Sequence, residues 1–107
     1  MDFREYQRIS RQTATYPAGS LEYVFLGLCS EAGEAAGKRK KIIRDANNVM
    51  NEEAKEAIAQ ELGDCLWYVA QICTEIGLDM QDVAEGNLQK LLSRQERGVI
   101  QGSGDDR

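Results

Sequence analysis

The sequence predicts a single-domain, all-α protein. Its 107 residues suffice for one domain and not for two. Apolar residues make up 42% of the chain, which is enough for a core, and there is one proline. Apolar residues recur at helical spacing in four segments, and no segment has the alternation that is typical of a strand. We therefore expect four main helices in one domain, residues 1–107.

The first two helices are separated by a strong breaker. Phe3, Tyr6 and Ile9 recur every third residue, which predicts a helix over about 2–13. The segment Tyr16-Pro17-Ala18-Gly19 follows and disfavours helix, because the residue before a proline avoids the helical region. Ser20 is then a plausible N-cap for a second helix that runs to about residue 44.

The second half of the chain has similar boundary signals. An asparagine-rich loop is expected over 45–51, followed by a helix over 52–76 that Gly77 would end. Asp79 and Asp82 resemble a capping pair for a fourth helix that ends near Arg97. Residues 98–107 include three glycines and should lack regular structure. This tail is either a frayed end or a lid in which Asp105 or Arg107 closes on a substrate.

The second and third helices are too long to be covered by this chain alone. Each has about 25 residues and so a length of about 37 Å. Their apolar side chains need further partners, which a second copy could supply by completing a bundle. We therefore expect a homodimer or a homotetramer (a dimer of dimers) whose interface covers Leu21, Val24, Phe25, Leu28, Ile58, Leu62, Leu66, Val69 and Ile72.

Composition excludes several functions. The chain has 18 acidic and 13 basic residues, a net charge of −5, which disfavours a nucleic-acid partner. With no histidine there is no imidazole base and no histidine-based zinc site. Charged residues interrupt the start, and no uncharged stretch approaches the ~20 residues of a membrane span. Cys29, Cys65 and Cys73 form no CxxC pair and are expected to be buried thiols, so we predict a cytoplasmic protein without a membrane partner.

Two acidic tetrads are the main functional signal. Glu31-Ala32-Gly33-Glu34 and Glu61-Leu62-Gly63-Asp64 each place two acids three residues apart on one helix face. Glycine inside a helix costs about 1 kcal/mol relative to alanine, so its presence in both tetrads suggests a close approach of the two helices.

An antiparallel arrangement would bring the two tetrads together. Ten residues separate Glu34 from Arg44, and nine separate Glu52 from Glu61. The four carboxylates would then lie at the same height and repel one another unless they bind protons or cations. Oxygen ligands suit Mg²⁺ or Mn²⁺, so the tetrads predict a metal site.

Basic and polar residues continue these faces. Lys38 and Lys41 follow Glu31 and Glu34 on one stripe of the second helix, and Tyr68 shares a stripe with the second tetrad. On the fourth helix, Asn87, Lys90 and Arg94 share a face. Together with the metal site, these residues suit a polyphosphate, and Tyr68 could stack on a base.

These residues resemble the MazG-like nucleoside triphosphate pyrophosphohydrolases, from about Tyr6 to Arg107. The strongest parts are LGL before the first tetrad, KK and RD after it, ELGDCLWY around the second, and Asn87-Leu88 with Lys90-Leu91 and Arg94. The glycine-rich end is similar to that of small single-domain members. Ser30 stands where many members have a further glutamate, which leaves the number of metal ions open.

The resemblance implies hydrolysis of an NTP or dNTP to the monophosphate and pyrophosphate. It implies Mg²⁺ ligation by Glu31, Glu34, Glu61 and Asp64, with Glu34 and Glu61 catalytic and Glu34 the candidate base for the attacking water. Lys38, Lys41, Asn87, Lys90 and Arg94 would hold phosphates or the sugar. Two alternatives stay open: a non-enzymatic helical dimer with a structural cation site, and a related hydrolase acting on an alarmone or another pyrophosphate compound.

Overall fold

A computed structural model describes residues 1–107 and confirms the all-α fold. Four α-helices are present: α1 (Phe3–Ser10), α2 (Leu21–Asp45), α3 (Glu52–Ile76) and α4 (Met80–Glu96). A short 3₁₀ helix, η1 (Arg11–Thr13), follows α1, and the chain contains no strand. The long helices begin and end within about one residue of their predicted bounds.

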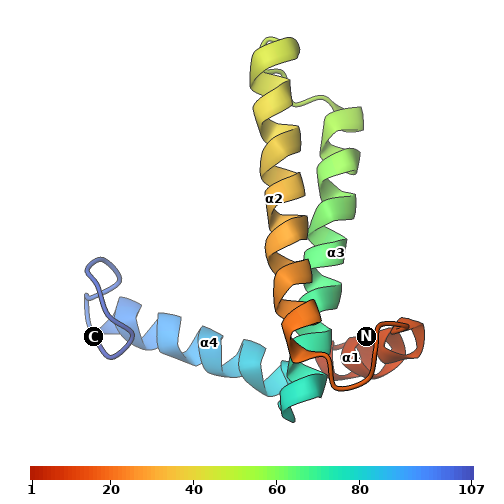
Figure 1. The fold of residues 1–107 in the computed structure, drawn as a ribbon. Helices are drawn as coiled ribbons and strands as arrows, with labels where there is room; N and C mark the ends of the chain where they lie inside the picture. The colour runs from red at the N-terminus through yellow and green to blue at the C-terminus, as the bar shows by residue number, and fades with distance from the viewer.

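The helices α2 and α3 form an antiparallel hairpin that is the main body of the molecule (Figure 1). In the connecting loop, Asn47 and Asn48 have φ values of 53° and 58°, in the left-handed region that asparagine tolerates better than most residues. Asn51 then caps α3, because its side chain accepts a hydrogen bond of 2.8 Å from the Ala54 amide. The asparagine-rich loop is therefore a tight reversal of direction.

The other predicted boundaries hold with two differences. Gly77 ends α3 with a φ of 76°, and Asp79 caps α4 by accepting from the Gln81 amide. Ser20 precedes α2 as expected, but its side chain makes no capping hydrogen bond. The first helix is shorter than predicted: it ends at Ser10, and the chain tightens into η1, where the Thr13 hydroxyl bonds back to the Ser10 carbonyl.

The core lies at the open end of the hairpin, where α1 and the start of α4 meet α3. Ala70, Cys73 and Met80 are the buried apolar residues there. Beside them Gln71 is fully buried, and its amide donates to the Ser10 hydroxyl at 3.1 Å. This polar contact holds the end of α1 against the C-terminal part of α3.

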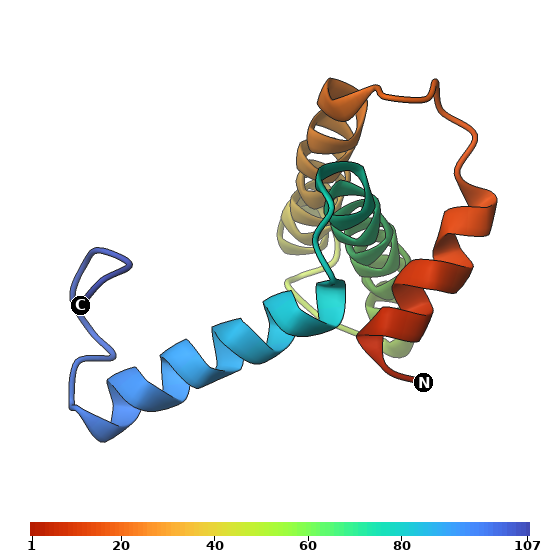
Figure 2. The ribbon, with the colours of Figure 1, turned by 90° about the horizontal axis from the view of Figure 1, so that it is seen from below.

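The helix α4 leaves the hairpin sideways instead of folding back along it (Figures 1 and 2). It contacts α1 and α3 but not α2. The radius of gyration is 16.8 Å, whereas a compact chain of this length has about 13 Å. Large apolar side chains on every long helix are exposed as a result: Phe25, Leu26, Leu62, Val83, Leu88, Leu91 and Leu92.

The tail after α4 has no regular structure, as predicted, but it is folded back on the end of α4. The Arg94 guanidinium is buried and donates to the Asp105 carbonyl at 2.6 Å, while Arg97 donates to the Arg107 carbonyl. Figure 2 shows this tail far from the hairpin of the same chain. Whether it acts as a lid stays a prediction.

The cysteine prediction was wrong for Cys29. This residue is exposed, because its side of α2 has no covering helix in one chain, while Cys65 is half-buried and Cys73 is buried. All three are free thiols. No helix combines the length and the apolar character needed to cross a membrane.

Candidate metal centre

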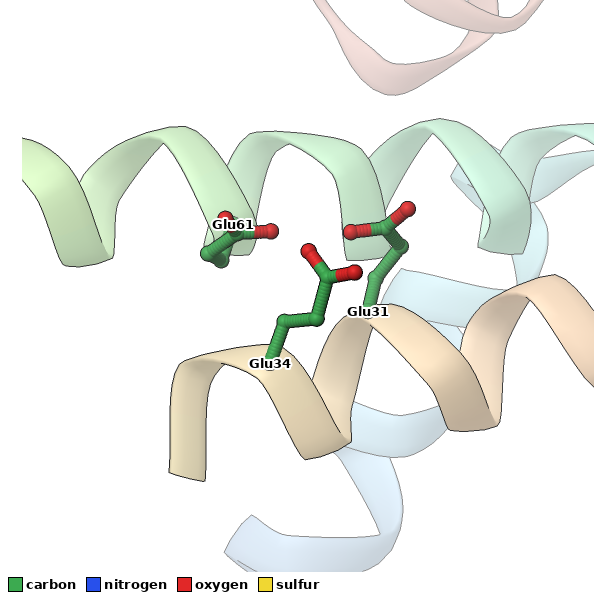
Figure 3. A group of neighbouring side chains, drawn as sticks. All are labelled: Glu31, Glu34 and Glu61. Atoms are coloured by element: carbon green, nitrogen blue, oxygen red, sulfur yellow. The ribbon is translucent and has the colours of Figure 1, made fainter. Parts of the chain in front are cut away.

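Three glutamates converge in the middle of the α2–α3 hairpin (Figure 3). Glu31 and Glu34 extend from successive turns of α2, and Glu61 extends toward them from α3. One oxygen of each lies within 4.8 Å of the others. The two helices therefore bring both halves of the predicted acidic site to one height, as the loop distances in the sequence suggested.

The cluster is strongly coupled electrostatically. A hydrogen bond with the Glu61 carboxyl group raises the pKa of Glu31 to about 7, and burial and the charges of Glu34 and Asp64 act in the same direction. The pKa of Glu61 is lowered instead, first by its bond with Lys38 and then by its bond with Glu31. Without a divalent cation, the cluster therefore keeps a proton to higher pH than a free glutamate would.

The chemistry of these side chains fits a hard divalent cation. Glu61 is buried and Glu31 is half-buried, and the Oε2 atom of each is buried without a hydrogen-bond partner. Buried polar atoms are nearly always satisfied, so two unpaired carboxylate oxygens in one cluster are consistent with cation binding. All the donors are oxygens, which suit Mg²⁺ or Mn²⁺.

The fourth predicted ligand, Asp64, lies outside this group. It is exposed and one turn further along α3 than Glu61. Its charge still acts on Glu31, whose pKa it helps to raise. Helical spacing predicted all four acids in one group, but only Glu31, Glu34 and Glu61 have oxygens within 4.8 Å of one another.

Lysines border the cluster on the side of the hairpin loop. The Lys38 ammonium lies 2.7 Å from Glu61 Oε1 and donates to the Ala57 carbonyl at 3.1 Å. It therefore bridges the two helices, a contact that the sequence did not reveal. Lys38 and Lys41 also line a cavity of 320 Å³, together with Ile42 and Val49.

Aromatic rings border the cluster on the opposite side. Tyr68 lies edge-on to Trp67 at 5.0 Å between ring centroids and 6.4 Å from Tyr23, which stacks on Tyr16. The Trp67 indole donates to the Thr13 hydroxyl at 2.8 Å. Tyr23 was not predicted from the sequence to belong to this aromatic group. Its position one helical turn before Gly27, on the same face of α2, was the signal that could have identified it.

The close approach of the hairpin helices occurs at Gly27 and not at the tetrad glycines. A Cβ atom on Gly27 would lie 2.1 Å from Cε1 of the Tyr68 ring. At Gly33 and Gly63, by contrast, a Cβ atom would meet nothing within 4 Å. The prediction that these two glycines mark a close helix contact was therefore wrong within one chain, because both lie on faces that point away from the partner helix.

The fourth-helix residues do not reach the cluster of the same chain. Asn87 and Lys90 are exposed on α4, which runs away from the hairpin (Figure 1). Arg94 is buried against the tail, and the only carboxylate within salt-bridge distance of either basic residue is Asp105, at 3.9 to 4.0 Å. These side chains can act on a cluster only if it belongs to another copy or if α4 changes direction.

The fold and the site define a class: an all-α protein with a carboxylate site between two antiparallel helices. Residues 20–99 match the MazG nucleotide pyrophosphohydrolase domain, and the chain belongs to this family. It is 46% identical over 109 residues to the gene 37 protein of Mycobacterium phage L5, an alignment that covers 95% of this chain and 96% of the relative. No solved structure matches the chain.

Proposed function

We propose that the protein hydrolyses a nucleoside triphosphate, ribo- or deoxyribo-, to the monophosphate and pyrophosphate in a Mg²⁺-dependent reaction that Mn²⁺ also supports. The observation that carries this proposal is the group of three glutamates within 4.8 Å, two of them with unpaired buried oxygens, in a chain of the MazG family. Such a site suits phosphoryl chemistry that needs no protein nucleophile.

Each carboxylate has a role that follows from its surroundings. Glu31, Glu34 and Glu61, with Asp64 beside them, would hold the cation. When bound, the cation supplies charge neutralisation for the phosphates and acidifies a water molecule. Glu34 is the exposed member of the three, so its carboxylate is accessible to an incoming water and is the candidate to accept that water's proton. Buried Glu61 instead fixes the site from α3.

The two ends of the hairpin suit the two ends of a nucleotide. Lys38 and Lys41 line the cavity on the loop side and would hold the phosphates. The half-buried Tyr68 ring lies on the other side and would stack against the base. The substrate would therefore lie along the hairpin with its base toward α1 and its terminal phosphate toward the loop.

We further propose a homodimer or homotetramer in which α4 of one copy completes the site of another. The exposed apolar side chains of α4 and the hairpin, among them Leu88 and Leu62, need cover. Packing of copies would bring Asn87, Lys90 and Arg94 toward a cluster that they do not reach within one chain. A light-scattering mass equal to one chain at micromolar concentration would contradict this arrangement.

The test is pyrophosphate release from a panel of canonical and damaged nucleotides in Mg²⁺, with Glu61→Gln as the decisive variant. Loss of a ligand should cost at least about 100-fold in turnover, since even residues that only orient ligands are worth 10- to 100-fold. Glu56→Gln, an exposed acid on the same helix, is the matched control and should keep wild-type turnover.

The remaining outcomes separate the other hypotheses. Turnover of an alarmone or another pyrophosphate compound, but not of triphosphates, would change the proposed substrate but leave the proposed site unchanged. Thermal stabilisation by Mg²⁺ without turnover of any substrate would indicate a structural cation site. Near-normal turnover by Glu61→Gln would refute the proposed site.

A further inference from the structure

The side chain of Lys38 lies where a cation is expected. It emerges from α2 one turn after Glu34, and its ammonium contacts Glu61 Oε1 at 2.7 Å while donating to the Ala57 carbonyl. Glu61 is buried, and the Lys38 side chain is only 35% exposed. Because Glu61 is buried, water screens this ion pair less than it would screen a fully exposed pair.

This contact conflicts with cation binding by the same carboxylate. One oxygen of Glu61 is paired with the ammonium, and the other is buried and unpaired. An ammonium and a divalent cation on one carboxylate would repel each other in a poorly hydrated site. This repulsion favours departure of the ammonium from Glu61 when the divalent cation binds.

The structure provides a place for the displaced lysine. Lys38 also lines the 320 Å³ cavity toward the hairpin loop, together with Lys41, Ile42 and Val49. The flexible side chain can turn into this cavity while its backbone stays in α2. There its ammonium would lie beside that of Lys41, which would be unfavourable without an anion between them.

We propose that Lys38 is a built-in counter-ion of the metal-free site, which cation binding displaces from Glu61 and makes available to the terminal phosphates of the substrate. This inference rests on the proposed function. It explains how the metal-free protein tolerates the repulsion among the clustered acids. It also means that the position of the Lys38 side chain depends on whether the cation is bound. The triphosphate gains its lysine contact only once the cation is in place, which favours binding of the cation before the nucleotide.

Calorimetry with Mn²⁺ and no nucleotide tests the displacement. Lys38→Met keeps the apolar part of the side chain and removes the competitor, so Mn²⁺ should bind about fivefold more tightly or better. Lys40→Met, an exposed neighbour on α2, controls for the loss of one positive charge and should change the affinity less than twofold. Weaker binding by Lys38→Met, or an effect equal to that of Lys40→Met, would overturn the inference.

A second measurement follows the lysine directly in the wild-type protein. Mass spectrometry after brief treatment with an amine-reactive reagent reports the accessibility of each ammonium. The labelling rate of Lys38, relative to that of Lys40, should rise several-fold when Mn²⁺ saturates the site. An unchanged ratio would contradict displacement. If the wild-type protein binds no Mn²⁺ at all, the proposed function fails as well, whereas binding without displacement defeats only this inference.

Discussion

Replacing Gly27 by alanine should destabilise the hairpin, although the same change elsewhere on these helices should stabilise it. Alanine is favoured over glycine inside a helix by about 1 kcal/mol. At Gly27 this gain is opposed by overlap with three atoms of the Tyr68 ring, at 2.1, 2.3 and 2.7 Å from the new Cβ. The ring would have to leave its position against Trp67 and Tyr23.

The matched control is Gly63→Ala, whose Cβ would meet nothing within 4 Å. Both variants gain the same helical preference, so the difference between their stabilities measures the cost of the overlap between the new Cβ atom and the Tyr68 ring. Overpacking of this kind costs about 1 to 3 kcal/mol. Gly63→Ala should therefore be more stable than Gly27→Ala by that amount, which corresponds to about 4 to 8 °C in melting temperature for each kcal/mol.

The assay is thermal unfolding followed by circular dichroism, at one protein concentration and with a fixed amount of Mg²⁺, because association and metal binding both shift the midpoint. Equal melting temperatures for the two variants would refute the close contact between Gly27 and the tyrosine ring. Destabilisation by Gly63→Ala would instead indicate that another copy approaches α3 at that point.

Two further predictions concern pH and the tail. The pKa of Glu31 is raised to about 7 from 4.5, so the unfolded chain releases this proton at lower pH than the folded protein does, and the stability of the metal-free protein should fall as pH rises from 4.5 to 7. The lowered pKa of Glu61 has the opposite effect on stability, but only below pH 4.5, so a comparison of melting temperatures at about pH 5 and pH 8 isolates the effect of Glu31. Glu31→Gln or saturating Mg²⁺ should remove the difference between the two melting temperatures. Equal wild-type melting temperatures at the two pH values would disprove this prediction. Deletion of residues 98–107 should raise KM or lower kcat if the tail is a lid, and unchanged steady-state kinetics would rule the lid out.

The helix boundaries could be predicted because each is encoded locally. Asn51, Gly77 and Asp79 act on backbone groups within four residues, so no knowledge of distant contacts is needed. The height match of Glu34 and Glu61 could also be predicted, since a short loop between antiparallel helices fixes their offset. Local rules thus account for the hairpin and for three of the four proposed ligands.

Interactions between elements could not be predicted in the same way. Helical spacing assigns residues to a face but gives neither the rotation of that face toward its neighbour nor the direction of the next helix. This is why Gly27 rather than Gly33 or Gly63 makes the close contact, and why α4 was expected within a bundle but runs outward. The pairing of Lys38 with Glu61 depends on the same rotation.

The short reversal at Asn47 and Asn48 has a consequence for the folding process. All three converging glutamates lie on the two arms that this loop joins, so their assembly requires only contacts between neighbouring segments of the chain. Chains rich in such contacts close rapidly, because little loop entropy is lost. If the two arms pair early, repulsion among the acids arises at that stage, and Lys38 on α2 lies beside Glu61, where it can offset this repulsion.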